Sequence, residues 1–427
     1  MFQPRARVGP TKVLAFGAMG FAVGLFLGYV FMGTAHAILQ LRAETASQAS
    51  LDGLTRISSA QGASGSALGR SGFGEQHPKA ATKAVESVVR TPGIPYKGTT
   101  IHTLVTSNGS PYLNFQNRIM YATYKAVQKQ PGGHQLVALT RILHRTKPDI
   151  LYDEVPSFRA DPLTPACDTW CEFPVSDRPN AVMQFFKAAA KEPSMIKAPW
   201  LLLIETDYIW MKPLQAPAAH APSSRGMAYP FNYIVPQAPA LEAVMRKMFP
   251  AELGPLDAIP GSGPAPVMMR FDEWLQVAPE WERLTAHIEA DPESKERLGW
   301  VREMYAFSTA VALKDIKLDI VACPECPLIS QPPADTSLGG AAMFHYTWGT
   351  VFKDSFGRKI WEFDKRTYTD EIIQRQTPRI PMPPKFDFGW TLQDGQPVKR
   401  ELYNTMVEMI EVVNTAVDSL PILEPVQ

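Results

Sequence analysis

A short apolar run, Trp200–Ile204 (WLLLI), constrains the fold of this chain more than any other feature, because it is followed at once by Glu205-Thr206-Asp207. An uninterrupted run of this length is typical of a strand that is buried on both faces of a sheet. In open α/β sheets, ligands bind beyond the carboxyl ends of the strands. The sequence therefore places two acidic residues where a ligand site is expected.

The residues before this strand alternate between strand and helix patterns. Residues 100–106 are β-branched and apolar and end in a turn cluster, whereas 114–127 carry apolar side chains at helical spacing. A short apolar run at 135–139 and an amphipathic segment at 179–191 follow. Strand, helix, strand, helix and buried strand predict an α/β fold.

The N-terminal part of the chain predicts a membrane anchor. Residues 13–33 contain no charged side chain, and a helix of this length spans about 31 Å, the thickness of a bilayer core. Basic residues lie in 1–12 and the next charge is Arg42, so we expect the tail 1–12 in the cytosol and the rest of the chain in the lumen. Ala35-His36-Ala37 resembles a cleavage site, but the apolar run is longer than the core of a signal peptide and favours an uncleaved anchor.

Three glycines of the anchor are spaced four residues apart on one helical face: Gly20, Gly24 and Gly28. Such spacing lets two membrane helices approach closely, so a homodimer through the anchor is one interpretation. The other is that glycine is simply common in membrane helices.

Composition separates the remaining regions. Residues 34–97 are rich in Ala, Ser, Gly and Thr and poor in large apolar side chains, which predicts a flexible stem. We expect a large luminal domain over 98–400, followed by a C-terminal helix and tail over 401–427. This layout is typical of Golgi-resident enzymes, although many receptors share it. The 42 basic and 42 acidic residues balance, which argues against a nucleic-acid partner.

A metal site is the chemistry that the acidic motif favours. Glu205 and Asp207 are one residue apart, so their carboxylates can point to the same side and bind Mg²⁺ or Mn²⁺. His345, in a second apolar run, is the candidate third ligand. The alternatives are a solvated acidic turn and a core histidine. With a metal, the pattern is that of a nucleotide-sugar transferase, in which the cation neutralises the leaving diphosphate.

Several longer motifs occur in a fixed order along the chain. They are QNRIMYATYK (116–125), LTRILH (139–144), ETDYIWMKPL (205–214), GPAPVMM, DPESKERLGWVREMYAF (291–307), QPP (331–333), FHYTWG and WEFDKR (361–366). Together they resemble the hydroxyproline O-arabinosyltransferases of plants and green algae, with peptidyl-serine galactosyltransferases as more distant kin. The similarity covers about residues 98–400. Land-plant relatives carry Pro where this chain has Thr206, a change that touches no proposed ligand.

The resemblance implies a Golgi type II membrane enzyme with a glycosyltransferase domain of the GT-A type, a Rossmann-like mixed sheet flanked by helices. It further implies UDP-β-L-arabinofuranose as the donor, Mn²⁺ as the cofactor and hydroxyproline of secreted wall glycoproteins as the acceptor. Donor and product are both β-linked, so configuration would be retained, either through a covalent carboxylate or by same-face attack. The rival interpretations are galactosyl transfer to serine, a non-catalytic Golgi binding protein and a metal-dependent hydrolase.

Donor-binding residues follow from the resemblance. Thr106 and Ser107 end the first strand, where such folds receive uridine and ribose. Arg118 is a candidate for the phosphate or the uracil, with an internal ion pair as its alternative role. Arg178 opens a predicted helix and can reach the donor or the metal ligands, or serve only in capping. Lys365 and Arg366 are expected to close over the diphosphate.

Further residues are expected at the sugar and the acceptor. Glu303 and Asp291 are the acids expected to face the sugar, although a core helix with one exposed Glu is an equal alternative. The candidate acceptor-binding aromatic residues are Phe231, Tyr233, Trp300, Tyr346 and Trp348. Their rings suit a peptide that arrives as a preformed polyproline II helix.

The four cysteines form two close pairs, Cys167 with Cys171 and Cys323 with Cys326. In the cytosol this spacing would suggest zinc, whereas in the secretory path disulfides are favoured, with their connectivity left open. Asn108 lies in a glycosylation pattern, but it ends a strand before Pro111, so we expect poor use of it.

Overall fold

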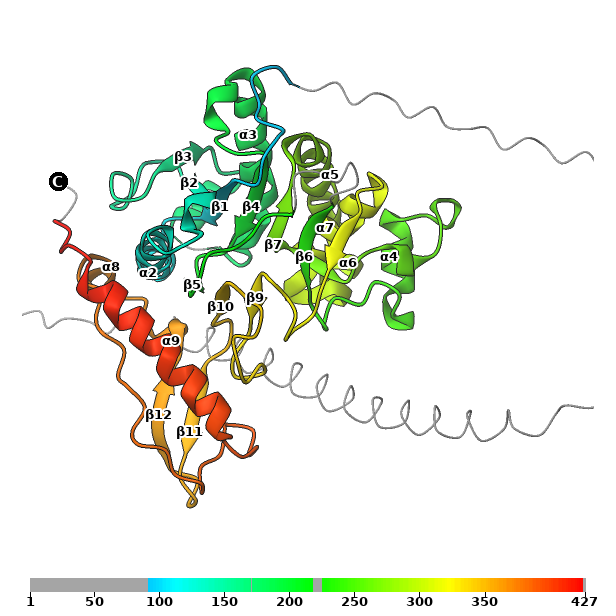
Figure 1. Ribbon diagram of the computed structural model, residues 1–427. Coiled ribbons are helices and arrows are strands. Elements are labelled where there is room, and N and C mark those ends of the chain that lie inside the picture. Colours follow the sequence, from blue (N-terminus) through cyan, green and yellow to red (C-terminus); the bar gives the residue numbers. More distant parts are fainter. Residues whose placement is uncertain (1–90, 170, 218–224, 425–427) are drawn as a thin grey trace, which may run out of the picture. The chain divides into compact units, whose positions relative to one another are not determined.

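The buried strand Trp200–Ile204 lies in the middle of a seven-stranded mixed sheet in the computed structural model (Figure 1). The structure describes residues 91–169, 171–217 and 225–424, all of which belong to one compact unit. The strand order is β3-β2-β1-β4-β7-β6-β8. The bounds are β1 Ile101–Ser107, β2 Leu136–His144, β3 Ser157–Ala160, β4 Trp200–Ile204, β6 Gly226–Pro230, β7 Ser262–Met269 and β8 Leu318–Ile320. The predicted α/β fold is confirmed, and β2 is longer than the expected 135–139.

The direction of the strands explains where a site can form. β1 pairs in parallel with β2 and β4, and β2 pairs in parallel with β3. β7 runs antiparallel to both β4 and β6, so the strand pairing changes from parallel to antiparallel at β4. The carboxyl ends of β1, β2 and β4 therefore share one edge of the sheet, and the acidic motif starts there.

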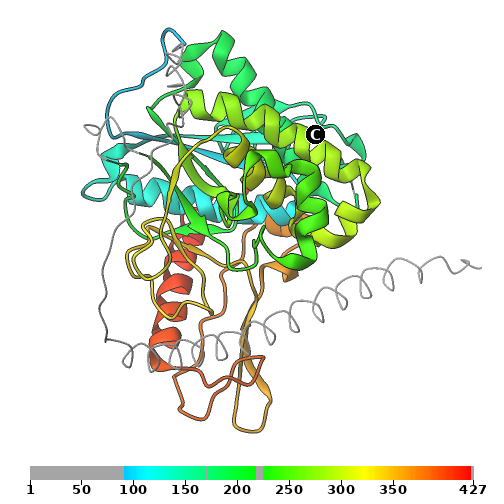
Figure 2. The ribbon, with the colours of Figure 1, turned by 90° about the vertical axis from the view of Figure 1, so that its right-hand side faces the viewer.

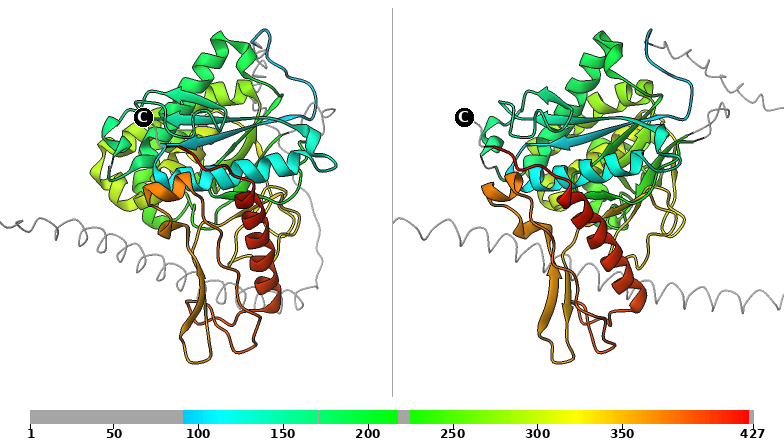
Figure 3. Two further views of the ribbon diagram at one scale, coloured as in Figure 1. Left: turned by 90° about the vertical axis from the view of Figure 1, so that its left-hand side faces the viewer. Right: turned by 60° about the vertical axis from the view of Figure 1, so that its left-hand side comes forward.

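Helices cover both faces of the sheet. α2 (Pro111–Gln128) lies on one face, and α3 (Arg178–Lys191) and α5 (Phe271–Ala290) lie on the other, as Figure 3 shows. α5 also packs on α7 (Arg302–Leu313), which contacts β7. α2 begins three residues earlier than expected because Ser110 caps it by accepting a hydrogen bond from Leu113 N, with Pro111 in the first turn. Two short helices, α4 (Glu242–Met248) and α6 (Pro292–Leu298), complete this part.

A small second sheet begins directly after the acidic motif. It has the order β5-β10-β9, with bounds Tyr208–Trp210, Met343–His345 and Ile329–Ser330. β5 follows Asp207 directly and pairs antiparallel with β10, with His345 opposite Tyr208. This pairing brings a histidine from far along the chain to the acidic residues.

The C-terminal part of the chain forms a hairpin and a long helix. The hairpin consists of β11 (Thr350–Lys353) and β12 (Lys359–Phe363), and α9 (Arg400–Asp418) lies beside it in Figures 1 and 2. The hairpin and α9 contribute side chains to a second hydrophobic cluster, which contains Phe352, Trp361 and Met406. α9 and the short helix α8 (Glu371–Arg375) also contact α2, so this part is attached to the first helix of the sheet domain.

Residues just before β1 pack on the domain. Ile94 is buried in the main hydrophobic core, and the carbonyl oxygen of Tyr96 accepts a hydrogen bond of 3.0 Å from Arg270. The end of the expected stem, residues 91–97, is therefore in contact with the folded domain. The predicted anchor over 13–33 and the stem up to residue 90 lie outside the described residues. No helix in the described part of the chain is both long and apolar enough to cross a membrane.

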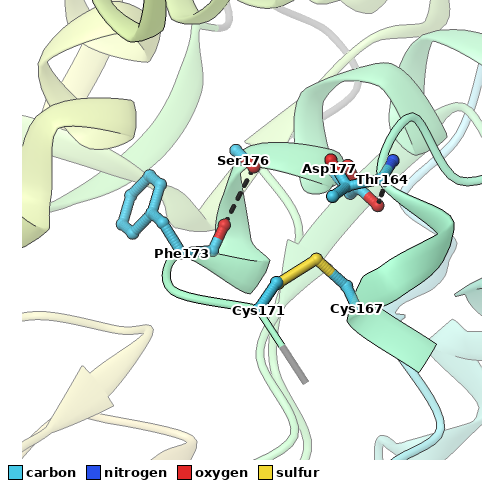
Figure 4. Close-up of a disulfide and its surroundings, with 6 residues drawn as sticks. All are labelled: Thr164, Cys167, Cys171, Phe173, Ser176 and Asp177. Atoms are coloured by element: carbon cyan, nitrogen blue, oxygen red, sulfur yellow. Dashed lines mark hydrogen bonds between the residues drawn. A yellow bond between two sulfur atoms is a disulfide. The ribbon is translucent and has the colours of Figure 1, made fainter. Parts of the chain in front are cut away.

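The first cysteine pair is joined locally. Cys167 and Cys171 form a disulfide in the loop before α3, and Figure 4 shows Asp177 and Thr164 closing the same loop by a hydrogen bond. Cys323 and Cys326 are free thiols, so the expectation that disulfides join the cysteines is wrong for this second pair. Asn108 is buried, and its side-chain oxygen accepts a hydrogen bond from Ser110 N, which is in keeping with the expectation of poor glycosylation.

Candidate functional site

Two carboxylates and an imidazole converge at the carboxyl end of β4. Nε2 of His345 lies 3.1 Å from Oδ2 of Asp207 and 3.8 Å from Oε2 of Glu205. One ligand atom from each of the three residues lies within 4.8 Å of the others. Two hard oxygen donors and one imidazole nitrogen suit Mn²⁺ or Mg²⁺, so these residues fit a divalent cation. The structure thus brings together all three of the predicted metal ligands.

Two basic side chains reach this cluster from different elements. Lys365, in the 3-10 turn Lys365–Thr367 after β12, donates a hydrogen bond to Oδ2 of Asp207. Arg178, the first residue of α3, bridges two carboxylates: it donates to Oε1 of Glu303 at 2.9 Å and to Oε1 of Glu205 at 2.5 Å. Two of the predicted donor-binding residues and one predicted acid therefore lie at the metal cluster.

Burial and charge set the protonation states of these acids. Burial opposes ionisation of Asp207, but the positive charge of Lys365 and the contact with His345 outweigh it and lower the pKa of Asp207. Glu303 is also buried, and burial raises its pKa to about 7, because Arg178 offsets desolvation only in part and Glu205 adds repulsion. The site thus holds one firmly ionised carboxylate and one carboxyl group that titrates near neutral pH.

Three tyrosines face the cluster. Burial and the nearby charges of Glu205 and Asp207 raise the pKa of Tyr208 well above its ordinary value, and burial and Asp207 do the same for Tyr346. Among the described residues, the hydroxyls of Tyr208 and Tyr346 are buried without a hydrogen-bond partner. Burial and Glu205 also raise the pKa of Tyr233, a residue that remains 39% exposed. A buried hydroxyl without a partner is costly, so the hydroxyls of Tyr208 and Tyr346 retain unused hydrogen-bonding capacity.

Two of the predicted polar residues have other partners. Arg118 is fully buried and binds Glu154 and the backbone carbonyls of Gln374, Arg375 and Pro421, which is the internal ion-pair role. Asp291 precedes α6 and pairs with Lys247 at 2.6 Å. The structure does not bring either residue into the group formed by Glu205, Asp207 and His345.

Four more predicted residues lie at the end of a strand or in the segment that follows one. Arg366 pairs with Asp364, and Ser107 accepts hydrogen bonds from Gly109 N and Asn117. Thr106 is buried at the end of β1, and Trp348 is half-buried in the segment after β10.

The predicted aromatic residues differ in exposure. Phe231 is buried against Tyr229 and Tyr233 in the main core, whereas Trp300 is 59% exposed and packs edge-on against Phe173. Phe231 is therefore placed as a core residue. Trp300 and Tyr233 keep surface that a ligand can contact.

Two polar residues that support the cluster were not singled out from the sequence. Gln331 binds Nδ1 of His345 at 2.9 Å, and Gln116 accepts a hydrogen bond of 2.9 Å from Thr206, between the two acidic residues. Both lie in motifs of the resemblance, QPP and QNRIMYATYK. Their place in these motifs is a signal that the sequence offers, whereas their burial is seen only in the structure.

Comparison with known proteins places the chain in a family. The family model "Hydroxyproline O-arabinosyltransferase family N-terminal domain" matches residues 101–320. Hydroxyproline O-arabinosyltransferase 2 of Arabidopsis thaliana is 32% identical over 326 residues, which cover 75% of this chain and 81% of that protein. Hydroxyproline O-arabinosyltransferase NOD3 of Pisum sativum is 32% identical over 325 residues, which cover 75% and 87%. These matches define the chain as an enzyme of the glycosyltransferase class.

Within that class the chain belongs to the hydroxyproline O-arabinosyltransferase family. The family that the sequence motifs indicate is thereby confirmed. Solved structures with some likeness include a glycosyltransferase involved in glycosylation of the major capsid of PBCV-1, with 11% identity, a TM-score of 0.30 and coverage of 58% of this chain and 93% of that one. Mouse xyloside xylosyltransferase 1 has 13% identity, a TM-score of 0.29 and coverage of 58% and 97%. At these TM-scores the likeness carries no inference about this chain.

Proposed function

We propose that this enzyme transfers L-arabinofuranose from UDP-β-L-arabinofuranose to the hydroxyl group of hydroxyproline in secreted cell-wall glycoproteins, with Mn²⁺ and with retention of configuration. The observation that carries the proposal is the convergence of Glu205, Asp207 and His345 at the carboxyl end of β4, with Lys365 in contact. The family supports the reaction, and the donor set supports the metal. The GT-A type of the domain is part of the same proposal.

The metal cluster and its basic neighbours act on the leaving diphosphate. A bound divalent cation supplies positive charge that neutralises the diphosphate. Glu205, Asp207 and His345 would hold it, and Lys365, whose side chain is 11% exposed, adds a positive charge beside Asp207. In a buried site such charges stabilise developing negative charge more strongly than they do in water.

Glu303 is the acid that we assign to the sugar and acceptor. It is 3% exposed, Arg178 holds one of its oxygens, and its pKa of about 7 leaves it partly protonated at neutral pH. A carboxyl group in this state can exchange a proton with an acceptor hydroxyl. Arg178 fixes its position relative to Glu205, so the proton-exchanging group and the metal ligands keep a constant separation.

The acceptor is proposed to bind along exposed aromatic surface near the cluster. Tyr233, Trp300 and Trp348 keep exposed or half-buried surface, whereas the predicted Tyr346 is buried. Hydroxyproline-rich peptides are polyproline II helices, which lose little entropy on docking against aromatic rings.

The location of the enzyme is proposed from the sequence pattern. The uncharged run 13–33 serves as a signal anchor in the Golgi membrane, with the tail 1–12 in the cytosol and the catalytic domain in the lumen. Gly20, Gly24 and Gly28 are the residues through which two anchors would pair as a homodimer.

Activity assays with defined donors and acceptors test this function. The purified chain is incubated with Mn²⁺ and a panel of UDP-sugars, together with hydroxyproline peptides, the same peptides with unmodified proline, and serine peptides. We expect arabinosyl transfer to hydroxyproline alone, abolished by EDTA and restored by Mn²⁺. Transfer of galactose to serine would move the chain to the galactosyltransferase relatives, and full activity in EDTA would refute the metal site. Absence of transfer from every donor would favour a binding protein.

A further inference from the structure

His345 is held from both sides of its ring. Nε2 faces Asp207 at 3.1 Å, and Nδ1 faces Nε2 of Gln331 at 2.9 Å. Both side chains are almost completely buried, with exposed fractions of 2% for His345 and 4% for Gln331. The imidazole therefore has one fixed partner on the metal side and one on the opposite side.

The position of Gln331 is set by the backbone. β9 pairs in parallel with β10, with Ile329 opposite Met343 and Ser330 opposite Phe344, so Gln331, the residue after β9, lies beside His345. Gln331 N donates a hydrogen bond of 2.7 Å to Oδ2 of Asp335. The pairing register of β9 and β10 therefore places the amide group of Gln331 next to the imidazole of His345.

The orientation of the Gln331 amide determines which nitrogen of the His345 ring carries the proton. An amide nitrogen only donates, so with Nε2 of Gln331 against it Nδ1 accepts, and the ring proton is on Nε2, from which it is donated to Asp207. A nitrogen that bears a proton cannot bind a cation. If the amide of Gln331 turns over, its oxygen accepts a proton from Nδ1 and leaves the lone pair of His345 Nε2 directed at the metal side.

We propose that Gln331 is a positioning residue that selects the metal-binding tautomer of His345, presenting its amide oxygen to Nδ1 when a cation is bound and its amide nitrogen when Nε2 keeps the ring proton and donates a hydrogen bond to Asp207. This rests on the proposed metal-dependent function. Glutamine is suited to the task because it offers a donor and an acceptor from one position and adds no charge to the cluster.

Two substitutions separate hydrogen bonding from packing. Gln331→Met keeps the length of the side chain and removes both hydrogen-bonding groups, whereas Gln331→Glu offers only acceptors and fixes the proton on Nδ1. The matched control is Gln374→Met, which removes a buried glutamine that binds Asn114. Thermal unfolding of each variant shows whether it is folded.

Mn²⁺ affinity is measured on the full chain in detergent by the electron paramagnetic resonance signal of free Mn²⁺, without donor or acceptor. We expect Gln331→Met to weaken Mn²⁺ binding by about 10–100-fold. We expect Gln331→Glu and Gln374→Met to bind at least as well as the unsubstituted chain. Unchanged affinity in Gln331→Met overturns the proposal, as does an equal loss in Gln331→Glu, which would indicate packing. Absence of Mn²⁺ binding by the unsubstituted chain would instead overturn the metal site itself and this inference with it.

Discussion

Two arginines, the fully buried Arg118 and Arg178 with 12% of its side chain exposed, occupy comparable places in the fold and have different surroundings. Each lies in the first half of a helix that leads from one strand region of the sheet to the next, on opposite faces. Arg118 binds one carboxylate, Glu154 at 2.8 Å, and otherwise backbone carbonyls from the end of the chain. Arg178 binds two carboxylates, Glu205 and Glu303.

The difference shows which buried charges are available for function. The positive charge of Arg118 is balanced by the single negative charge of Glu154, and its other partners are uncharged groups such as backbone carbonyls. Around Arg178 and Lys365 two positive charges meet three carboxylates, those of Glu205, Asp207 and Glu303. An excess of acid held at a strand end can accept a cation, whereas a saturated ion pair only joins segments of the chain.

The largest expected effect comes from removing a metal-binding carboxylate. Asp207→Asn keeps the shape of the side chain but removes the charge that would hold the cation, so we expect kcat to fall by about 10⁴-fold, or about 5.5 kcal/mol of barrier. Steady-state kinetics and circular dichroism measure activity and fold. Asp291→Asn, which alters an acid paired with Lys247 at another part of the surface, is the control and should retain activity. Comparable activity in both variants would remove the distinction between the two acids.

Exchanging each arginine for methionine tests the comparison directly. Arg118→Met leaves Glu154 and several buried carbonyls without their partner, so we expect the free energy of unfolding to fall by about 3–5 kcal/mol while kcat per folded molecule is unchanged. Arg178→Met should lower kcat by about 100-fold, because Glu303 loses the group that orients it. Urea denaturation and kinetics on both variants provide the readout. A loss of kcat in Arg118→Met at unchanged stability would break the comparison.

A smaller effect concerns the pH dependence that Glu303 confers. Its pKa is raised from 4.5 to about 7, so the folded state keeps a proton that the unfolded state has lost between these values, and the free energy of unfolding falls as pH rises through that window. Glu303→Gln should remove this dependence, with a difference from the unsubstituted chain that grows by about 3 kcal/mol from pH 4.5 to 7. Urea denaturation at several pH values measures it. Parallel profiles for the two proteins would show that Glu303 does not titrate in this range.

The smallest effect is expected at the start of the domain, where Arg270 binds the carbonyl oxygen of Tyr96. A chain starting at residue 99 loses this contact and the burial of Ile94, which a chain starting at residue 85 keeps. We expect a loss of about 2–3 kcal/mol, because burying one Ile side chain contributes about 1.5–3 kcal/mol. Thermal unfolding compares the two chains, and both should remain active. Equal midpoints would mean that residues 91–98 add nothing to stability.

Local patterns were enough to predict part of this molecule. WLLLI followed by two acids predicted a buried strand with a ligand site at its end, and His345 was identified because its apolar run marked another strand. The buried strand and the proximity of His345 to the acids agree with these predictions, because strand burial and polarity are determined by a few adjacent residues. Arg178 was expected either to reach the donor or the metal ligands or to serve only in capping, and in the structure it contacts Glu205.

Long-range pairing was beyond the same reasoning. The partners of Arg118 are backbone carbonyls, which every residue possesses, so no residue type in the sequence identifies them. The contact between Gln331 and His345 depends on the register of β9 and β10, two strands that are too short to show a recognisable sequence pattern. Spacing alone could not show that Cys167 and Cys171 form a local disulfide whereas Cys323 and Cys326 remain free thiols.

The contact between Arg118 and the carbonyl oxygen of Pro421 also has a consequence in time. The two residues are 303 positions apart, and a ribosome adds about 5–20 residues each second, so Arg118 is synthesised about 15–60 s before this partner exists. During that interval the guanidinium lacks an acceptor that it has in the finished domain. Completion of the buried network around α2 must therefore follow synthesis of the chain's last residues, however early the sheet itself begins to form.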